Sequence, residues 1–123
     1  RAGLVAWALQ HLHDAARYGS LATVAAACGG AAALSNLLNN LPVAIVASYV
    51  AAHDPSGRLA YATIVGVDVG PNLTTAGSLA TLLWLTVLDR RGVRVDPLEF
   101  TRLGALVVPP VIAVTVAWLW LVR

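Results

Sequence analysis

The chain has 123 residues, of which 59% are apolar and 11% are charged, and its formal net charge is +2 at pH 7. Soluble domains contain about 25% charged residues, so this composition excludes a soluble globular domain and indicates an integral membrane protein. The basic residues are all arginines, and they separate apolar runs instead of forming a nucleic-acid-binding stripe. We therefore interpret them as topology determinants.

The first residues, 1–12, have the pattern of the end of a membrane span, and the lack of Met indicates a piece of a longer protein. His11, His13 and Asp14 follow closely enough in sequence to offer a metal site. A solvated loop explains the same residues, because side chains two positions apart do not share a helix face. We favour the loop and expect no metal.

Residues 20–52 predict a re-entrant helical hairpin, which enters the membrane and returns to the same side. Ser20 to Leu34 is rich in Ala and Gly, a composition that lets membrane helices approach closely. Leu41 to Ala52 is a second apolar run, but its roughly twelve residues extend only about 18 Å against about 30 Å of hydrocarbon. The turn between the two runs, SNLLNNLP, contains four polar residues: Ser35, Asn36, Asn39 and Asn40.

Residues 59–88 predict one span made of two half-helices, interrupted from Gly66 to Ser78. They number about 30, more than the roughly 20 that one span needs and fewer than two spans require. Gly70 lowers helix propensity and Pro71 removes a backbone donor, and Pro71 is expected in the first turn of the second half-helix. Unwound backbone at this depth needs polar surroundings, for which the stretch offers Asn72, Thr74, Thr75 and Ser78.

The loop after the broken helix is rich in arginine, with Arg90, Arg91 and Arg94. The positive-inside rule places this loop in the cytoplasm. Residues 100–122 form the last complete span, in which Pro109 and Pro110 should cause a kink. The fold class is therefore all-α: a polytopic plasma-membrane protein with a re-entrant hairpin, a broken transmembrane helix and a final transmembrane helix.

Asp68 is the only acid predicted inside the bilayer, where a charge is costly and usually functional. It could carry a proton, or it could cap the second half-helix. The polar residues of the hairpin turn have two interpretations as well, substrate binding or ordinary turn chemistry. Cys28 is the only cysteine, which excludes a disulfide framework and a cysteine metal cluster within this chain.

Two stretches carry a family resemblance: SNLLNNLPVAI, from Ser35 to Ile45, and GVDVGPNLTTAGSLATLLWLTVL, from Gly66 to Leu88. They resemble the bacterial arsenite efflux permeases, the arsenical pump membrane proteins of the ion-transporter superfamily. The resemblance runs from about Ser20 to Leu121 and implies the C-terminal portion of such a permease. In this superfamily each of two inverted repeats contributes a re-entrant hairpin and a broken helix, whose polar tips meet at the substrate.

The resemblance implies a role for each polar residue of these stretches. Asp68 would carry the coupling proton, and Gly70 with Pro71 would form the helix break. In the dicarboxylate branch the hairpin tip reads Ser-Asn-Thr, whereas here Leu37 follows Asn36, which argues against a carboxylate substrate. The resemblance places Ser35, Asn36 and Asn40 at the hairpin tip, and Asn72, Thr74 and Ser78 with Asp68 and Gly70 in the break. Together with the neighbouring polar residues Asn39 and Thr75, the predicted substrate-binding residues are Ser35, Asn36, Asn39, Asn40, Asn72, Thr74, Thr75 and Ser78.

The expected activity is export of arsenite, with antimonite as an option, in exchange for protons. Neutral As(OH)3 is a small polyol that hydroxyl and amide groups can bind, and one cysteine cannot form a thiolate cage. Expected partners are the lipid bilayer, arsenite and protons. An arsenite-stimulated ATPase subunit and a homodimer are further options, and no nucleic acid or cofactor is expected.

Three other functions compete with arsenite export. A sodium/proton antiporter or a citrate or dicarboxylate carrier of the same superfamily would use the same scaffold. A purely structural membrane subunit is another alternative. An intramembrane enzyme is not expected, because an aspartyl protease needs two membrane acids and the chain contains no HExxH metalloprotease motif.

Overall fold

The computed structural model describes residues 3, 20–52, 54 and 56–122, and its regular elements are all helical. The all-α prediction is confirmed. Two of these helices, α2 and α6, are long and apolar enough to cross a membrane. The predicted end of a span in residues 1–12, with His11, His13 and Asp14, lies outside the described residues. In chain order the elements are α2 (Ser20–Leu38), α3 (Asn40–Ala52), α4 (Arg58–Val69), the 3-10 helix η1 (Gly70–Leu73), α5 (Leu79–Arg90) and α6 (Pro97–Leu121).

Helices α2 and α3 form a hairpin with a sharper turn than the sequence predicts. Only Asn39 separates them, and its φ of 72° lies in the left-handed region, which asparagine tolerates better than most residues. Ser35 and Asn36 therefore belong to the last turns of α2 and not to the connecting turn. The 13 residues of α3 extend about 20 Å, so its length still falls short of a bilayer crossing.

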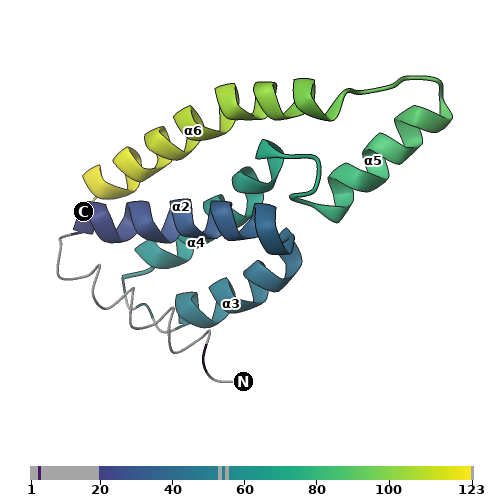
Figure 1. Ribbon diagram of the computed structural model, residues 1–123. Helices are drawn as coiled ribbons and strands as arrows, with labels where there is room; N and C mark the ends of the chain where they lie inside the picture. Colours follow the sequence, from purple (N-terminus) through teal and green to yellow (C-terminus); the bar gives the residue numbers. More distant parts are fainter. Residues whose placement is uncertain (1–2, 4–19, 53, 55, 123) are drawn as a thin grey trace.

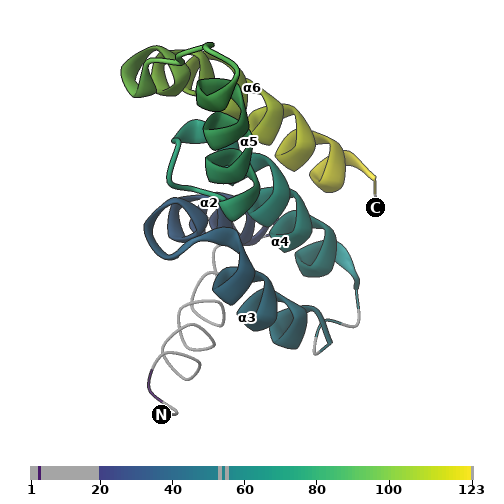
Figure 2. The ribbon, with the colours of Figure 1, turned by 90° about the vertical axis from the view of Figure 1, so that its right-hand side faces the viewer.

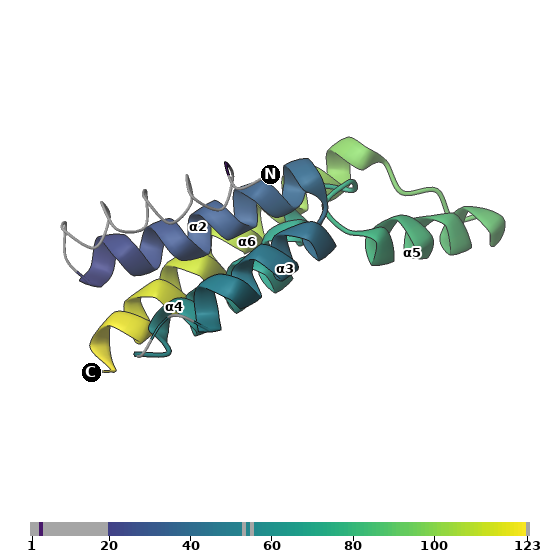
Figure 3. The ribbon, with the colours of Figure 1, turned by 90° about the horizontal axis from the view of Figure 1, so that it is seen from below.

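Helices α4 and α5 follow one another in the same general direction, and α6 runs back along η1 and α4 (Figures 1 and 3). The interruption between α4 and α5 begins at Gly70, one helical turn later than the predicted start at Gly66. Helix α6 has 25 residues and continues through Pro109 and Pro110. Its axis follows a curved course (Figure 1).

The core consists of small side chains around α4, which lies between α3 and α6 and also packs on α2 (Figure 2). Helix α5 projects away from this bundle and has no buried residue (Figure 3). Small residues allow the helix backbones to approach closely, as membrane interfaces require. One buried cluster joins α2, α4 and α6, and comprises Val24, Ala27, Cys28, Ala62 and Val116; the second joins α2, α3 and α4, and comprises Ala31, Val43, Ala47 and Val67.

Two glycines one helical turn apart, Gly66 in α4 and Gly70 at the start of η1, lie directly against α2. A Cβ atom on Gly66 would strike the carbonyl oxygen of Cys28 and lie 2.8 Å from Cβ of Ala31. A Cβ atom on Gly70 would strike the backbone of Ala32. The sequence GVDVG therefore works as a GxxxG packing motif, in which glycine lets two backbones touch.

The loop between α3 and α4 is organised by the carboxylate of Asp54. It accepts hydrogen bonds from Ser56 N at 3.0 Å, from Ser56 Oγ at 2.7 Å and from Leu59 N at 2.7 Å. Partial burial raises the pKa of Asp54, but these hydrogen bonds outweigh that effect and the pKa lies below its ordinary value. The carboxylate thus satisfies a free amide in the first turn of α4.

We expect Asp54→Ala to lower the free energy of unfolding by about 1 kcal/mol at pH 7, as for loss of a helix cap. Because the folded-state pKa is depressed, the contribution is complete above about pH 3.9 and is lost as the pH falls through the folded-state pKa. Thermal unfolding of the full-length protein in detergent at pH 7 and at decreasing pH measures both effects. Asp89→Ala is the control, because Asp89 is exposed and its only described ion pair, with Arg94, spans 3.7 Å. A difference from wild type that grows on acidification contradicts the prediction.

Candidate substrate site

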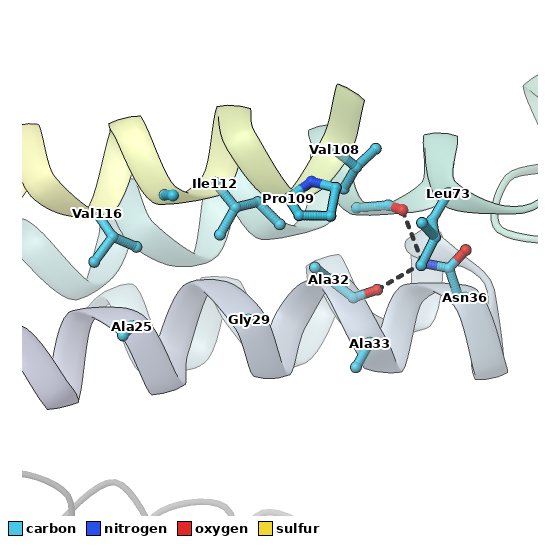
Figure 4. A pocket seen from close by; sticks show the side chains of 12 residues that line it. Ala25, Gly29, Ala32, Ala33, Asn36, Leu73, Val108, Pro109, Ile112 and Val116 are labelled. Carbon is cyan, nitrogen blue, oxygen red and sulfur yellow. Dashed lines mark hydrogen bonds between the residues drawn. The ribbon is translucent and has the colours of Figure 1, made fainter. Parts of the chain in front are cut away.

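The side chain of Asn36 connects the hairpin to the break between α4 and α5. Its Nδ2 donates to Ala32 O at 2.9 Å within α2 and to Gly70 O at 2.8 Å across the interface (Figure 4). Its Oδ1 accepts a hydrogen bond from Thr74 Oγ1 at 2.8 Å. One carboxamide of α2 thereby holds two residues of the break, which lie 34 and 38 positions further along the chain.

A backbone hydrogen bond adds a second connection between the two segments. Asn40 N, at the start of α3, donates to Gly77 O at 3.2 Å. Gly77 is buried, and a Cβ atom there would strike Pro71 O and lie 2.9 Å from Asn36 Oδ1. Only glycine fits this position without displacing its neighbours. The polar end of the hairpin and the break thus meet, as the family resemblance implies.

The side chains of the other polar residues of the hairpin differ in whether they have hydrogen-bond partners. Ser35 is fully buried, and its Oγ donates to Ala31 O at 2.8 Å within α2. Asn39 is half-buried, and its Oδ1 is buried without a hydrogen-bond partner among the described residues. Because a buried acceptor of this kind usually has a partner, Asn39 Oδ1 is available to one that is not part of the described chain.

The break itself satisfies most of its own backbone. Asn72 Nδ2 donates to Asp68 O at 3.0 Å and to Val69 O at 3.1 Å, which are carbonyls freed at the end of α4. Thr74 then takes an extended conformation, with φ −132° and ψ 158°. Thr75 is half-exposed, and its hydroxyl makes no hydrogen bond within the described part of the chain.

Ser78, and not Pro71, starts the second half-helix. Ser78 Oγ accepts a hydrogen bond from Ala80 N at 3.1 Å, the usual geometry of an N-cap serine. Pro71 lies in η1, so its predicted place in the first turn of α5 is wrong. The physical reason is that proline also fits the first turn of a short 3-10 helix, where its missing N–H has no partner to lose.

Asp68 lies in the last turn of α4, and its side chain is exposed at the rim of a groove between α3 and α4. The groove has a volume of about 580 Å³, and Ser48 is its other polar lining residue. The alternative prediction that Asp68 caps α5 is wrong, because Ser78 is the cap. Asp68 is separated from the hairpin end by the α4 backbone, since Asn36 contacts Gly70 on the side of α4 that faces α2.

A second cavity, of about 390 Å³, lies between α2 and α6 beside Asn36 (Figure 4). Its wall is apolar apart from that residue, with Gly29 and Ala33 on α2 and Pro109 and Ile112 on α6. Such a wall suits the packing of a further apolar chain and not the binding of a polar solute.

Glycine at position 104 of α6 is a part of the site that sequence reasoning missed. A Cβ atom on Gly104 would lie 2.7 Å from Leu73 O, so the α6 backbone rests directly on η1. Gly66 and Gly77 likewise allow close backbone contacts, Gly66 with α2 and Gly77 with Pro71. The GxxxG spacing could have revealed Gly66, whereas Gly77 and Gly104 have no such sequence signal.

No group of three metal-ligating side chains occurs within residues 20–52, 54 and 56–122. Cys28 is fully buried in the contact between α2 and α4, away from the polar end of the hairpin. The polar groups that meet at the break are therefore hydroxyls, carboxamides and backbone groups. Such groups bind a small neutral polyol through hydrogen bonds.

Comparison with known proteins identifies relatives of one kind. The family model described as arsenical pump membrane protein matches residues 1–122. The arsenical pump membrane protein of Escherichia coli (strain K12) is 37% identical over 89 residues, which is 68% of this chain and 21% of the relative. An uncharacterised transporter of Mycobacterium tuberculosis is 30% identical over 109 residues, which is 82% of this chain and 25% of the relative. No solved structure matches the chain.

The chain spans about a fifth to a quarter of the length of these curated relatives. The match of the family model to nearly the whole chain agrees with the apolar composition, the two helices of spanning length and the hairpin that meets a helix break. The chain thus belongs to the arsenical pump membrane protein family.

Proposed function

We propose that a full-length transporter carrying this sequence exports arsenite, and antimonite as a second substrate, as the neutral hydroxide in exchange for protons. The observation that carries the proposal is the contact between the hairpin end and the break through Asn36, Gly70 and Thr74. It brings polar groups from two segments together at a helix interruption, where secondary transporters commonly bind their substrates.

The substrate hydroxyls would bind to those polar groups that the fold leaves available. Asn39 Oδ1 is an unpartnered acceptor, and the Thr75 hydroxyl makes no hydrogen bond to a described residue. Asn40 is the first residue of α3 and follows Asn39 directly, and Thr74 Oγ1 retains acceptor capacity after donating to Asn36. We therefore narrow the predicted ligands to Asn39, Asn40, Thr74 and Thr75, with Ser35, Asn36, Asn72 and Ser78 in supporting roles.

Hydrogen bonding suits export better than arsenic–sulfur bonding, because the cargo has to be released on the other side of the membrane. The chain has one cysteine, and it is buried between α2 and α4. A sodium/proton antiporter is the second candidate, but it needs free carbonyl oxygens. The carbonyls of Asp68, Val69 and Gly70 each accept a hydrogen bond from the amides of Asn72 or Asn36, so one of the two lone pairs on each oxygen is already engaged and fewer are left to coordinate sodium.

We propose the following placement in the membrane. Residues 1–12 end one span, residues 20–52 enter and return as the re-entrant hairpin, residues 59–88 cross as the broken helix, and residues 100–122 form the last span. The short length of α3 supports the hairpin, and the common direction of α4 and α5 supports a single broken crossing (Figure 3). The loop with Arg90, Arg91 and Arg94 is then cytoplasmic.

Asp68 is our candidate for the coupling proton. It is an ionisable residue in a helix proposed to lie in the bilayer, and it borders the groove between α3 and α4. An arsenite-stimulated ATPase subunit and a second copy of the protein in a homodimer stay predictions from the family resemblance.

Arsenite accumulation in cells that lack their own exporter tests the function. We expect cells expressing the full-length protein to retain less arsenite than cells with an empty vector, and to lose this advantage when the proton gradient is collapsed. Growth in high sodium is measured in parallel. Unchanged arsenite accumulation together with increased sodium tolerance would replace the proposal by the antiporter alternative.

A further inference from the structure

We propose that Asn36 is a positioning residue that locks the hairpin to the break and holds Thr74 in place, and that it does not contact the substrate itself. The inference deepens the proposed function and rests on it. It separates Asn36 from the neighbouring asparagines, although all of them belong to one short polar run of the sequence.

The carboxamide of Asn36 has both of its N–H donors engaged within the chain. A carboxamide has two N–H donors, and Asn36 Nδ2 directs its donors to Ala32 O at 2.9 Å and Gly70 O at 2.8 Å. Oδ1 accepts from Thr74 Oγ1 at 2.8 Å. These lengths are typical of well-formed hydrogen bonds, so no donor of Asn36 is left for a ligand.

The loop after η1 covers part of the Asn36 carboxamide. A Cβ atom on Gly77 would lie 2.9 Å from Asn36 Oδ1, so the backbone of the loop after η1 closes directly over the carboxamide. The hydrogen bond from Asn40 N to Gly77 O holds that loop against the start of α3. The loop thus covers the Oδ1 side of the carboxamide, and the open side of Asn36 faces the apolar cavity between α2 and α6, whose wall does not suit a polar substrate.

The hydrogen bond from Thr74 to Asn36 fixes the position of Thr74. Thr74 is extended and follows the end of η1, so no regular helix fixes its orientation. Its described side-chain hydrogen bond is the one to Asn36. Loss of the lock lowers the fraction of molecules in which Thr74 is placed to bind the substrate. The apparent dissociation constant for the substrate rises in inverse proportion to that fraction. Removal of a part-buried hydrogen bond corresponds to about a tenfold change in the equilibrium between the locked and the unlocked loop.

The test compares Asn36→Ala and Asn36→Ser in the full-length protein, with initial rates of arsenite and antimonite uptake into everted membrane vesicles. Serine is included because its hydroxyl can bond Ala32 O, as Ser35 bonds Ala31 O, so it removes the two cross-interface bonds and leaves the bond within α2. We expect KM to rise about tenfold for both substrates, with their ratio unchanged. Thr86→Val is the control, because Thr86 Oγ1 donates to Leu82 O within α5.

Two kinetic outcomes would overturn the inference. A changed ratio of the arsenite and antimonite KM values would mean that Asn36 contacts the substrate, because a residue that only positions the loop cannot distinguish the two. An unchanged KM with less protein in the membrane would mean that Asn36 serves the fold alone.

A double-mutant cycle in the unliganded protein tests the lock without any transport measurement. We expect the losses of thermal stability caused by Asn36→Ser and Thr74→Val to be clearly non-additive, whereas Asn36→Ser and Thr86→Val should add. Additive losses for the first pair would refute the lock. If wild type does not move arsenite but the first pair is non-additive, the proposed function fails and the lock stands.

Discussion

Gly66→Ala is expected to destabilise the protein severely, although it adds a single methyl group. The new Cβ atom would strike the carbonyl oxygen of Cys28 and approach Cβ of Ala31 to 2.8 Å. Both are parts of the rigid α2 backbone or its first side-chain atoms, so no flexible side chain can move aside. Helices α2 and α4 would have to separate over the contact that holds the hairpin to the broken helix.

We expect a loss of about 3 kcal/mol in the free energy of unfolding, at the upper end of the usual effect of overpacking. Such a loss is a large share of the roughly 5–15 kcal/mol that folded proteins have in total. The measurement is the amount of full-length protein in the membrane, together with its thermal unfolding in detergent. Both should fall well below wild type.

Gly30→Ala is the matched control, because it makes the same change on α2 at a position where a Cβ atom meets nothing within 4 Å. Alanine there should leave membrane abundance at the wild-type level, since it has the higher helix propensity. If the two variants unfold at the same temperature, Gly66 does not make the close contact and the GxxxG interpretation is wrong.

Much of the architecture follows from the sequence because apolar runs and their lengths are strong signals in a membrane protein. The second half-helix was predicted from Leu79, where α5 begins, and the last span was predicted to end close to Leu121, where α6 ends. The meeting of the hairpin end with the break also follows from the family resemblance. These features depend on hydropathy and on residue types that are local in the sequence.

The partners of individual polar groups could not be predicted in the same way. Asn36 and Asn39 look alike in the sequence, yet one has its donors and Oδ1 engaged and the other has an unpartnered oxygen. The difference arises because α2 continues through Asn36, and the chain turns only at Asn39. Gly66 illustrates the same limit, since a glycine near Gly70 and Pro71 can indicate the start of a break, whereas a glycine in GxxxG indicates packing. Only the arrangement of α2 against α4 distinguishes the two.

Asp68→Asn is expected to abolish arsenite export while leaving the protein in the membrane at its normal amount. Asparagine has nearly the same shape as aspartate, but it cannot take up and release a proton. The Asp68 side chain is exposed at the rim of the groove between α3 and α4, and it makes no hydrogen bond to a described residue. The substitution should therefore remove proton coupling without disturbing the packing of α4.

The measurement is arsenite accumulation in cells that lack an exporter, normalised to membrane abundance. Accumulation with Asp68→Asn should rise to the level of cells with an empty vector, a complete loss of export. Asp89→Asn is the control, because Asp89 is an exposed carboxyl at the end of α5 whose described partner is Arg94. An Asp68→Asn protein that still exports arsenite as wild type does would place the coupling proton elsewhere in the transporter. In that case the acid would be expected in the part of the transporter that this chain does not include, because Asp68 is the one acid in the segments proposed to lie in the bilayer, residues 1–12, 20–52, 59–88 and 100–122.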